Sequence, residues 1–137
     1  MHAPEFVVNV TVGPGKYYAR LKLSENQFQE ANRRAVSIYV NGRKQVERLD
    51  IVASVEQSLS YQRLLRDKSV AERYREPARH ALDLVFQDIE PHNGIIELHF
   101  VGEPIGGVPT EAILNALEVG PGDGGEGAMP VMATQGR

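Results

Sequence analysis

The polar segment SENQFQEANR, residues 24 to 33, places one aromatic residue among side chains that can form hydrogen bonds. Sugar rings present apolar C–H faces, which proteins bind with exposed aromatic rings flanked by carboxylates, amides or guanidinium groups. Phe28 stands in this segment beside Glu25, Asn26 and Gln27. An aromatic side chain on a loop is not needed for the core, so the pattern indicates a binding site. Partial burial of Phe28 under a neighbouring loop is the alternative.

Four tyrosines are weaker candidates of the same kind. Tyr18 and Tyr39 fall on the polar faces of expected strands, and Tyr61 and Tyr74 fall in an irregular segment. Packing under a neighbouring loop or against a second sheet is the favoured explanation for each of them.

Neither a metal site nor a catalytic centre is indicated by the polar residues. The four histidines do not have the spacing of metal ligands: His2, His80, His92 and His99. Four carboxylates near one expected turn could in principle form an acid–base pair: Asp83, Asp88, Glu90 and Glu97. Solvated strand and turn positions explain them better. There is no nucleophile elbow and no phosphate-binding loop, so an enzyme is disfavoured, and no cofactor is expected.

Composition narrows the function classes further. The 137 residues suffice for one domain with its own core, and the formal net charge of −3 argues against a nucleic-acid partner. The sequence has no cysteine, and no apolar run is long enough to cross a membrane. The N-terminus lacks the pattern of a signal peptide and enters a β pattern within a few residues, so we expect a fragment of a longer protein.

Alternating apolar residues predict a series of β-strands. Residues 6–12 and 17–23 alternate on either side of Gly13-Pro14-Gly15, and we expect them to pair as a hairpin. Residues 36–40 are followed by Asn41-Gly42, the dipeptide favoured in a type I′ turn, and by a returning strand through Val46, Leu49, Ile51 and Val52.

The second half continues this pattern after an interruption. Residues 54–79 are rich in helix formers and predict one or two short helices or an ordered loop. Residues 82–86 and 96–100 alternate again around a turn at 91–94, which predicts a second hairpin, and residues 112–119 form the last apolar strand. About seven strands favour an all-β fold, an antiparallel β-sandwich of jelly-roll type over residues 1–119. The Gly- and Pro-rich residues 120–137 are expected to be a flexible tail or linker.

Four segments of this chain resemble malectin-like domains in order and spacing. They are GKYYARLKLSE, RAVSIYVNGRKQVERLDI, GIIELHFVG and AILNALEV, which together cover most of residues 6–119. The resemblance implies a jelly-roll carbohydrate-binding domain, a type found in an endoplasmic-reticulum lectin, in plant receptor ectodomains and attached to bacterial glycoside hydrolases.

The resemblance also implies site residues. Phe28 matches the second member of the family's aromatic pair, while Gln27 replaces the first. The family's binding aspartate precedes the last strand, where this chain has Thr110 and Glu111, so Glu111 is its expected substitute. The family's N-terminal strands are missing, which implies an open sheet edge and favours a homodimer or packing against a neighbouring domain.

Together these observations predict a non-catalytic carbohydrate-binding module for an oligosaccharide or polysaccharide. Phe28 would stack against a sugar face, and hydroxyls would bond to Glu25, Asn26, Gln27 and Glu111; Tyr61 and Tyr74 are the next candidates. The parent protein is expected to be a glycoside hydrolase or a cell-surface protein that is secreted, periplasmic or on the cell surface. A structural β-sandwich that packs against another domain and binds no sugar is the alternative.

Overall fold

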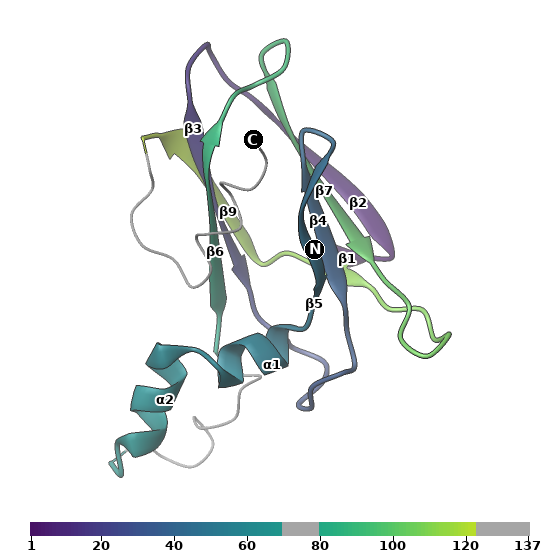
Figure 1. The fold of residues 1–137 in the computed structure, drawn as a ribbon, viewed down its shortest axis with the longest axis vertical. Helices are drawn as coiled ribbons and strands as arrows, with labels where there is room; N and C mark the ends of the chain where they lie inside the picture. Colours follow the sequence, from purple (N-terminus) through teal and green to yellow (C-terminus); the bar gives the residue numbers. More distant parts are fainter. Residues whose placement is uncertain (70–79, 123–137) are drawn as a thin grey trace.

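The computed structural model describes residues 1–69 and 80–122, and these form two antiparallel sheets that face each other (Figure 1). The four-stranded sheet has the order β2 (Glu5–Thr11), β7 (Ile95–Gly102), β4 (Val36–Val40), β5 (Arg43–Leu49). The three-stranded sheet has the order β6 (Leu82–Ile89), β3 (Tyr17–Leu23), β9 (Ala116–Pro121). Two short strands, β1 (His2–Ala3) and β8 (Ala112–Ile113), pair separately. The predicted antiparallel β-sandwich is confirmed.

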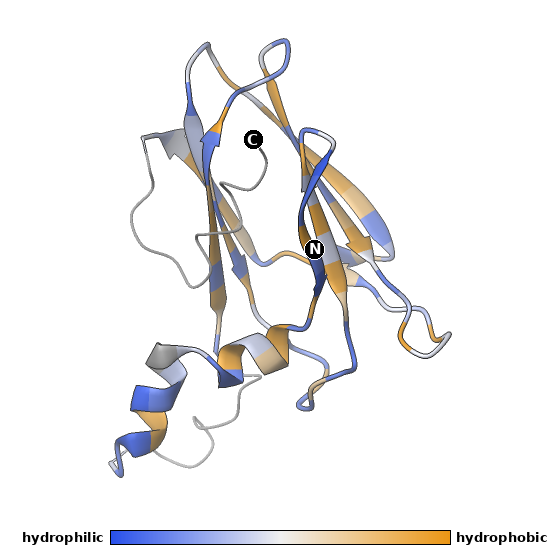
Figure 2. Ribbon diagram, in the orientation of Figure 1, coloured by the Kyte–Doolittle hydropathy of each residue, from blue (hydrophilic) through white to orange (hydrophobic). Residues whose placement is uncertain are grey.

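The core lies between the two sheets and follows from the period-2 pattern of the strands. Side chains alternate between the faces of a strand, so every second apolar residue points inward. Leu21 on β3, Leu84 on β6 and Leu98 on β7 are completely buried, and Phe86 and Phe100 are the largest of the fully buried side chains described. Figure 2 shows hydrophobic residues along most of the strands and hydrophilic ones in the turns, on β5 and on α2.

The Asn-Gly hairpin is confirmed, although its second strand ends earlier than expected. Asn41 and Gly42 have φ of 50° and 82°, as a type I′ turn requires, and β4 pairs with β5. Strand β5 stops at Leu49 because Asp50 caps the next element, and its Oδ1 accepts a hydrogen bond from Ala53 N at 3.1 Å. The expected strand positions Ile51 and Val52 are therefore helical.

Two short helices follow this cap. Helix α1 covers Ile51–Glu56, and helix α2 covers Leu59–Arg66, where the Ser58 hydroxyl accepts a bond from Tyr61 N at 3.2 Å. The helical insert expected at 54–79 thus begins at residue 51, and its part from 70 to 79 lies outside the described residues. Within residues 1–69 and 80–122, no helix has the length and apolarity to cross a bilayer.

Both of the other predicted hairpins are wrong in their pairing. Strand β2 pairs with β7, and β3 lies between β6 and β9. Strands β6 and β7 also belong to different sheets. In each case the turn between the two runs carries the chain from one sheet to the other. Alternation identifies a strand, but it does not identify the strand's partner, and short polar turns serve both purposes.

The last predicted strand is divided in two. Strand β8 ends at Ile113, and β9 begins at Ala116. Between them Leu114 N donates to Met1 O at 2.9 Å and Asn115 N donates to Lys22 O at 3.0 Å. The chain therefore leaves β1 and joins β3 at this point. Strand β9 extends to Pro121, and the predicted tail lies outside the described residues from position 123 on.

Candidate binding site

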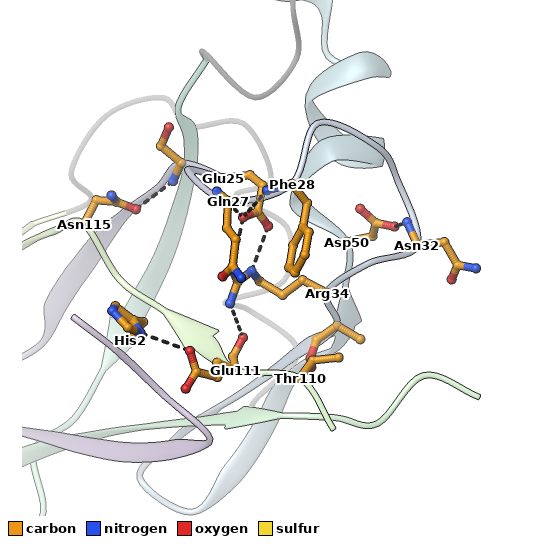
Figure 3. A network of polar contacts seen from close by, with 12 residues as sticks. His2, Glu25, Gln27, Phe28, Asn32, Arg34, Asp50, Thr110, Glu111 and Asn115 are labelled. Carbon is orange, nitrogen blue, oxygen red and sulfur yellow. Dashed lines mark hydrogen bonds and ion pairs between the residues drawn. The ribbon is translucent and has the colours of Figure 1, made fainter. Parts of the chain in front are cut away.

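The segment before β4 is held by a buried ion pair. The Glu25 carboxylate accepts a bond from Arg34 Nε at 2.7 Å and a second from Nη2 at 3.1 Å (Figure 3). Both side chains are nearly inaccessible, with 2% and 4% of their surface exposed. Glu25 Oε2 also accepts bonds from the backbone N–H groups of Gln27 and Phe28. The predicted sugar-binding loop is thus folded around one of its own carboxylates, because a buried charge needs a partner and hydrogen bonds.

Arg34 connects this loop to the segment that precedes β8. Its Nη1 donates to Glu111 O at 2.6 Å, and its Nη2 lies 3.4 Å from Gln27 Oε1. These bonds bring residues 25–28 and Glu111, which the sequence placed far apart, to the same end of the sandwich (Figure 3). Four of the five guanidinium N–H groups of Arg34 can be assigned to these contacts.

A hollow of about 170 Å³ opens between these two segments and the N-terminal strand. Its lining contains three side-chain amides, one guanidinium and apolar carbon, from Met1, His2, Asn26, Gln27, Arg34, Ile113 and Asn115. Asn115 Oδ1 accepts a bond from Ser24 N at 2.7 Å, which fixes the orientation of this amide. At the same end of the sandwich, His2 Nδ1 lies 3.0 Å from Glu111 Oε1.

Phe28 lies beside this hollow but does not line it. Its ring is half-buried, with the guanidinium carbon of Arg33 at 4.7 Å from the ring centroid and that of Arg34 at 5.4 Å. In Figure 3 the ring lies against the Arg34 side chain. The ring therefore packs on a buried side chain and keeps some exposed surface, and its role in sugar binding stays a prediction.

Glu25 was expected to bond to a ligand, but its side chain is buried. With both oxygens bonded and the side chain buried, Glu25 orients Gln27 and Phe28 instead of facing solvent. Asn26 and Gln27 are exposed and line the hollow, and Glu111 is linked to it through His2.

The other aromatic candidates lie elsewhere. Tyr61 is buried on α2, with its ring edge-on to that of His80 at 5.1 Å, and Tyr74 is outside the described residues. Tyr18 donates its hydroxyl proton to Glu118. Tyr39 lies on the outer face of β4, against His99 at 5.4 Å and under the Lys44 ammonium at 5.6 Å. None of these described tyrosines lines the hollow.

Three residues of the arrangement were not expected from the sequence: Arg34, His2 and Asn115. Arg34 precedes an apolar strand, which is a common place for a surface charge, so the sequence carried no signal of its burial. For Asn115 the sequence carried a weak signal of a special position. This residue interrupts the apolar run AILNALEV where a continuous strand would have an apolar residue.

The chemistry available in the hollow is hydrogen bonding to a polar ligand. Three amides supply both donors and acceptors, and the charge of Arg34 is compensated by Glu25. Among the residues that the structure describes, no group of three His, Asp or Glu side chains is placed to hold a metal ion. Antiparallel sandwiches commonly carry their binding residues on connecting loops, and this hollow lies among such loops.

Comparison with known proteins agrees with this class. The family model for the malectin domain matches residues 2–93, about two thirds of the sequence, and the chain belongs to the malectin domain family. Malectin domains are an extracellular, carbohydrate-binding type of domain and are generally non-catalytic. No curated protein sequence matches this chain.

The fold is shared with solved plant receptor structures. The ANXUR1 extracellular domain from Arabidopsis thaliana is 18% identical, with a TM-score of 0.60, and the match covers 84% of this chain and 26% of that one. The plant receptor-like kinase ANX2 gives 17% identity and a TM-score of 0.60 over the same shares. The plant receptor-like kinase FER gives 18% identity and a TM-score of 0.54, and the match covers 92% of this chain and 31% of that one. The chain therefore spans about a quarter to a third of the length of these structures.

Proposed function

We propose that this chain is a carbohydrate-binding module whose site is the amide-lined hollow beside Phe28. The observation that carries the proposal is the convergence of Asn26, Gln27 and Asn115 on one hollow, backed by the buried Arg34. Sugar hydroxyls are both donors and acceptors, and amides can bond with both. Glu111 and Phe28 flank these amides. Glu111 would accept a bond from a sugar hydroxyl, and Phe28 would pack on the apolar face of the sugar ring.

Each residue has a separate role in this proposal. Asn26, Gln27 and Asn115 contact hydroxyls, Glu111 accepts a further hydroxyl bond, and the exposed part of Phe28 packs on a ring face. Glu25 and Arg34 position these groups without needing to contact the ligand. A small hollow buries little ligand surface, so the affinity of one module is modest.

The kind of parent protein follows from the same proposal. A weak module gains effective affinity when it is linked to another domain that acts on or near the same polymer. A glycoside hydrolase and a cell-surface protein both fit this arrangement. The similarity to plant receptor extracellular domains favours the cell-surface protein, and nothing observed favours the hydrolase.

A glycan array followed by titration calorimetry tests the proposal. The chain is expected to bind a subset of oligosaccharides, and Gln27→Ala and Asn115→Ala are each expected to weaken that binding at least about tenfold, as the loss of a buried hydrogen bond to a ligand does. Gln29→Ala is the matched control, since Gln29 is exposed on the same loop and does not line the hollow. Binding that survives both site variants contradicts this location, and no binding at millimolar sugar contradicts the function.

A structural role is the second candidate, and one feature favours it. Val7 is 48% exposed on the outer face of the edge strand β2, and the inward-facing apolar residues of the same strand are only partly buried. A domain that only packs against another protein would use this surface and leave the hollow empty. Sugar binding would use the hollow at one end of the sandwich, whereas packing would use the edge strand β2. Gln27→Ala and Asn115→Ala change the hollow and not this edge, so they distinguish the two roles.

A further inference from the structure

One side of the sandwich is closed and the opposite side is open. Helix α1 follows β5 directly and contacts β6, so the edges formed by β5 and β6 lie on the same side, and those of β2 and β9 lie on the other. Figure 1 shows both helices away from β2. Leu84 and Phe86 on the edge strand β6 are 0% and 1% exposed. The inward-facing apolar residues of β2 and β9 are only partly buried: Phe6, Val8, Val10, Leu117 and Val119.

The open side ends in a row of backbone groups that no strand within residues 1–69 and 80–122 pairs with. Gly102 N donates to Pro4 O, and Val12 N donates to Gly94 O, both at 2.8 Å. Backbone groups of an antiparallel strand alternate in direction, so the even-numbered residues of β2 bond to β7. The N–H and C=O groups of the odd-numbered residues therefore point away from the sheet; these residues are Glu5, Val7, Asn9 and Thr11.

The other sheet edges carry features that oppose pairing. Strand β5 has Arg43, Lys44 and Glu47 exposed along it, together with register shifts in its pairing with β4. Strand β9 ends in Pro121, and β6 lies on the side of the helices. Charges, prolines and bulges are the devices that prevent edge-to-edge association. The single charge on β2 is that of Glu5, which already lies 2.5 Å from His99 Nε2.

We propose that β2 pairs antiparallel with β2 of a second copy of this chain, about a two-fold axis at Val8. In this register Val7 faces Asn9 of the other copy and Glu5 faces Thr11. All four residues whose backbone groups point away from the sheet therefore find hydrogen-bonding partners. Phe6 faces Val10, and Val8 faces Val8. No like charges oppose each other, and the partly buried apolar row continues into its copy.

The self-complementarity of the strand is the reason for choosing a second copy as the occupant. An isologous interface requires that one surface match itself after a two-fold rotation. Strand β2 meets this requirement with both its hydrogen-bonding groups and its side-chain faces, since odd residues oppose odd residues. The two four-stranded sheets then become one continuous sheet.

A single cysteine tests both the dimer and its register, because the chain has no cysteine of its own. At the axis the two Val8 Cα atoms form a non-hydrogen-bonded pair about 4.5 Å apart, within reach of a disulfide. Val8→Cys is expected to form at least about tenfold more cross-linked dimer on mild oxidation than Val10→Cys, which faces Phe6 in the other copy. Equal cross-linking of the two variants overturns the register.

Light scattering after size-exclusion chromatography tests association without cross-links. The wild-type chain is expected at twice its mass of 15.2 kDa. Asn9→Pro removes an N–H that points away from β7, so it is expected to keep the fold, checked by its melting temperature, and to raise the dimer dissociation constant at least about tenfold. Val108→Lys, at an exposed loop position, is the control for a surface change and is expected to leave the dimer intact. A monomer at millimolar concentration, or a dimer that Asn9→Pro does not weaken, overturns the proposal.

Discussion

The carboxylate of Glu25 and the guanidinium of Arg34 form a two-pronged ion pair, with contacts of 2.7 and 3.1 Å, at the end of the sandwich where two connecting segments meet. Arg34 also holds Glu111 O, and Glu25 holds the N–H groups of Gln27 and Phe28. The shape of the candidate site thus depends on a pair that is itself almost entirely buried.

Glu25→Ala is expected to lower the free energy of unfolding by about 3–5 kcal/mol, because it leaves the buried Arg34 charge without its partner. Urea unfolding followed by circular dichroism measures this change. Glu30→Ala is the control, since Glu30 is exposed and its ion pair with Arg33 is long, at 3.9 Å; its effect is expected to stay within about 0.5 kcal/mol. Similar effects from the two variants would contradict the structural role of Glu25.

Gly102→Ala is expected to destabilise the protein by at least about 3 kcal/mol through overpacking. A Cβ at this position would clash with Thr110 O and lie 2.9 Å from the carbonyl carbon of Glu111, both backbone atoms that cannot move aside freely. Gly106→Ala provides the comparison, because no atom lies within 4 Å of its Cβ and only its φ of +56° is unfavourable. If both variants melt at the same temperature, the close approach of the two segments is not rigid.

Arg33→Ala is expected to strengthen sugar binding by about two- to fivefold if the sugar packs on Phe28. The exposed Arg33 guanidinium lies 4.7 Å from the ring centroid and must be displaced before a sugar can occupy that face. A cation–π contact at an exposed position is worth about 0.5–1 kcal/mol, which corresponds to this change in affinity. Calorimetry with the sugar identified on the array measures it, and Phe28→Ala must weaken the same binding. Weaker binding by Arg33→Ala would show that the arginine itself contacts the sugar.

Tyr18 is expected to ionise at higher pH than an ordinary tyrosine. Its hydroxyl donates to Glu118, and this hydrogen bond, followed by desolvation and the negative charge of Glu118, raises the pKa of the phenol above 10.0. A raised pKa in the folded state means that the stabilisation is fully present below the unfolded pKa and is lost as the pH rises through the folded value. The difference between the ultraviolet titrations of wild type and Tyr18→Phe reports this group. Glu118→Gln is expected to lower the midpoint, and an unchanged midpoint would contradict the contact.

The sequence was most informative where the relevant interactions are local. Asn41-Gly42 specified a hairpin because its two positive φ angles are acceptable to these two residues and match the twist of the strands. Alternation identified β2, β3, β4, β6 and β7, since burying one face of a strand needs only period 2. The local signal was insufficient at Asp50, where an N-cap converted Ile51 and Val52 from an apparent strand into a helix.

Local sequence patterns predicted only part of the candidate site. The loop with Asn26, Gln27 and Phe28 could be singled out from its composition, and Glu111 from family resemblance. The burial of Glu25 could not be predicted from composition, because it depends on Arg34 folding back over the loop. Asn115 joined the site through a bond to Ser24, a contact across 91 positions in the sequence that no local pattern encodes.

The sequence by itself determined an all-β domain, its strands and one of its hairpins, because these depend on side-chain periodicity and turn conformation within a few residues. The tertiary structure alone decided which strands pair, which polar residues are buried and which loops form the hollow. Strand pairing and ion-pair burial are set by the free energy of the whole packed sandwich, in which β2 lies beside β7 and Arg34 beside Glu25. Contacts of this kind depend on where the chain crosses between the sheets, and short turns such as Gly13-Pro14-Gly15 are compatible with either route.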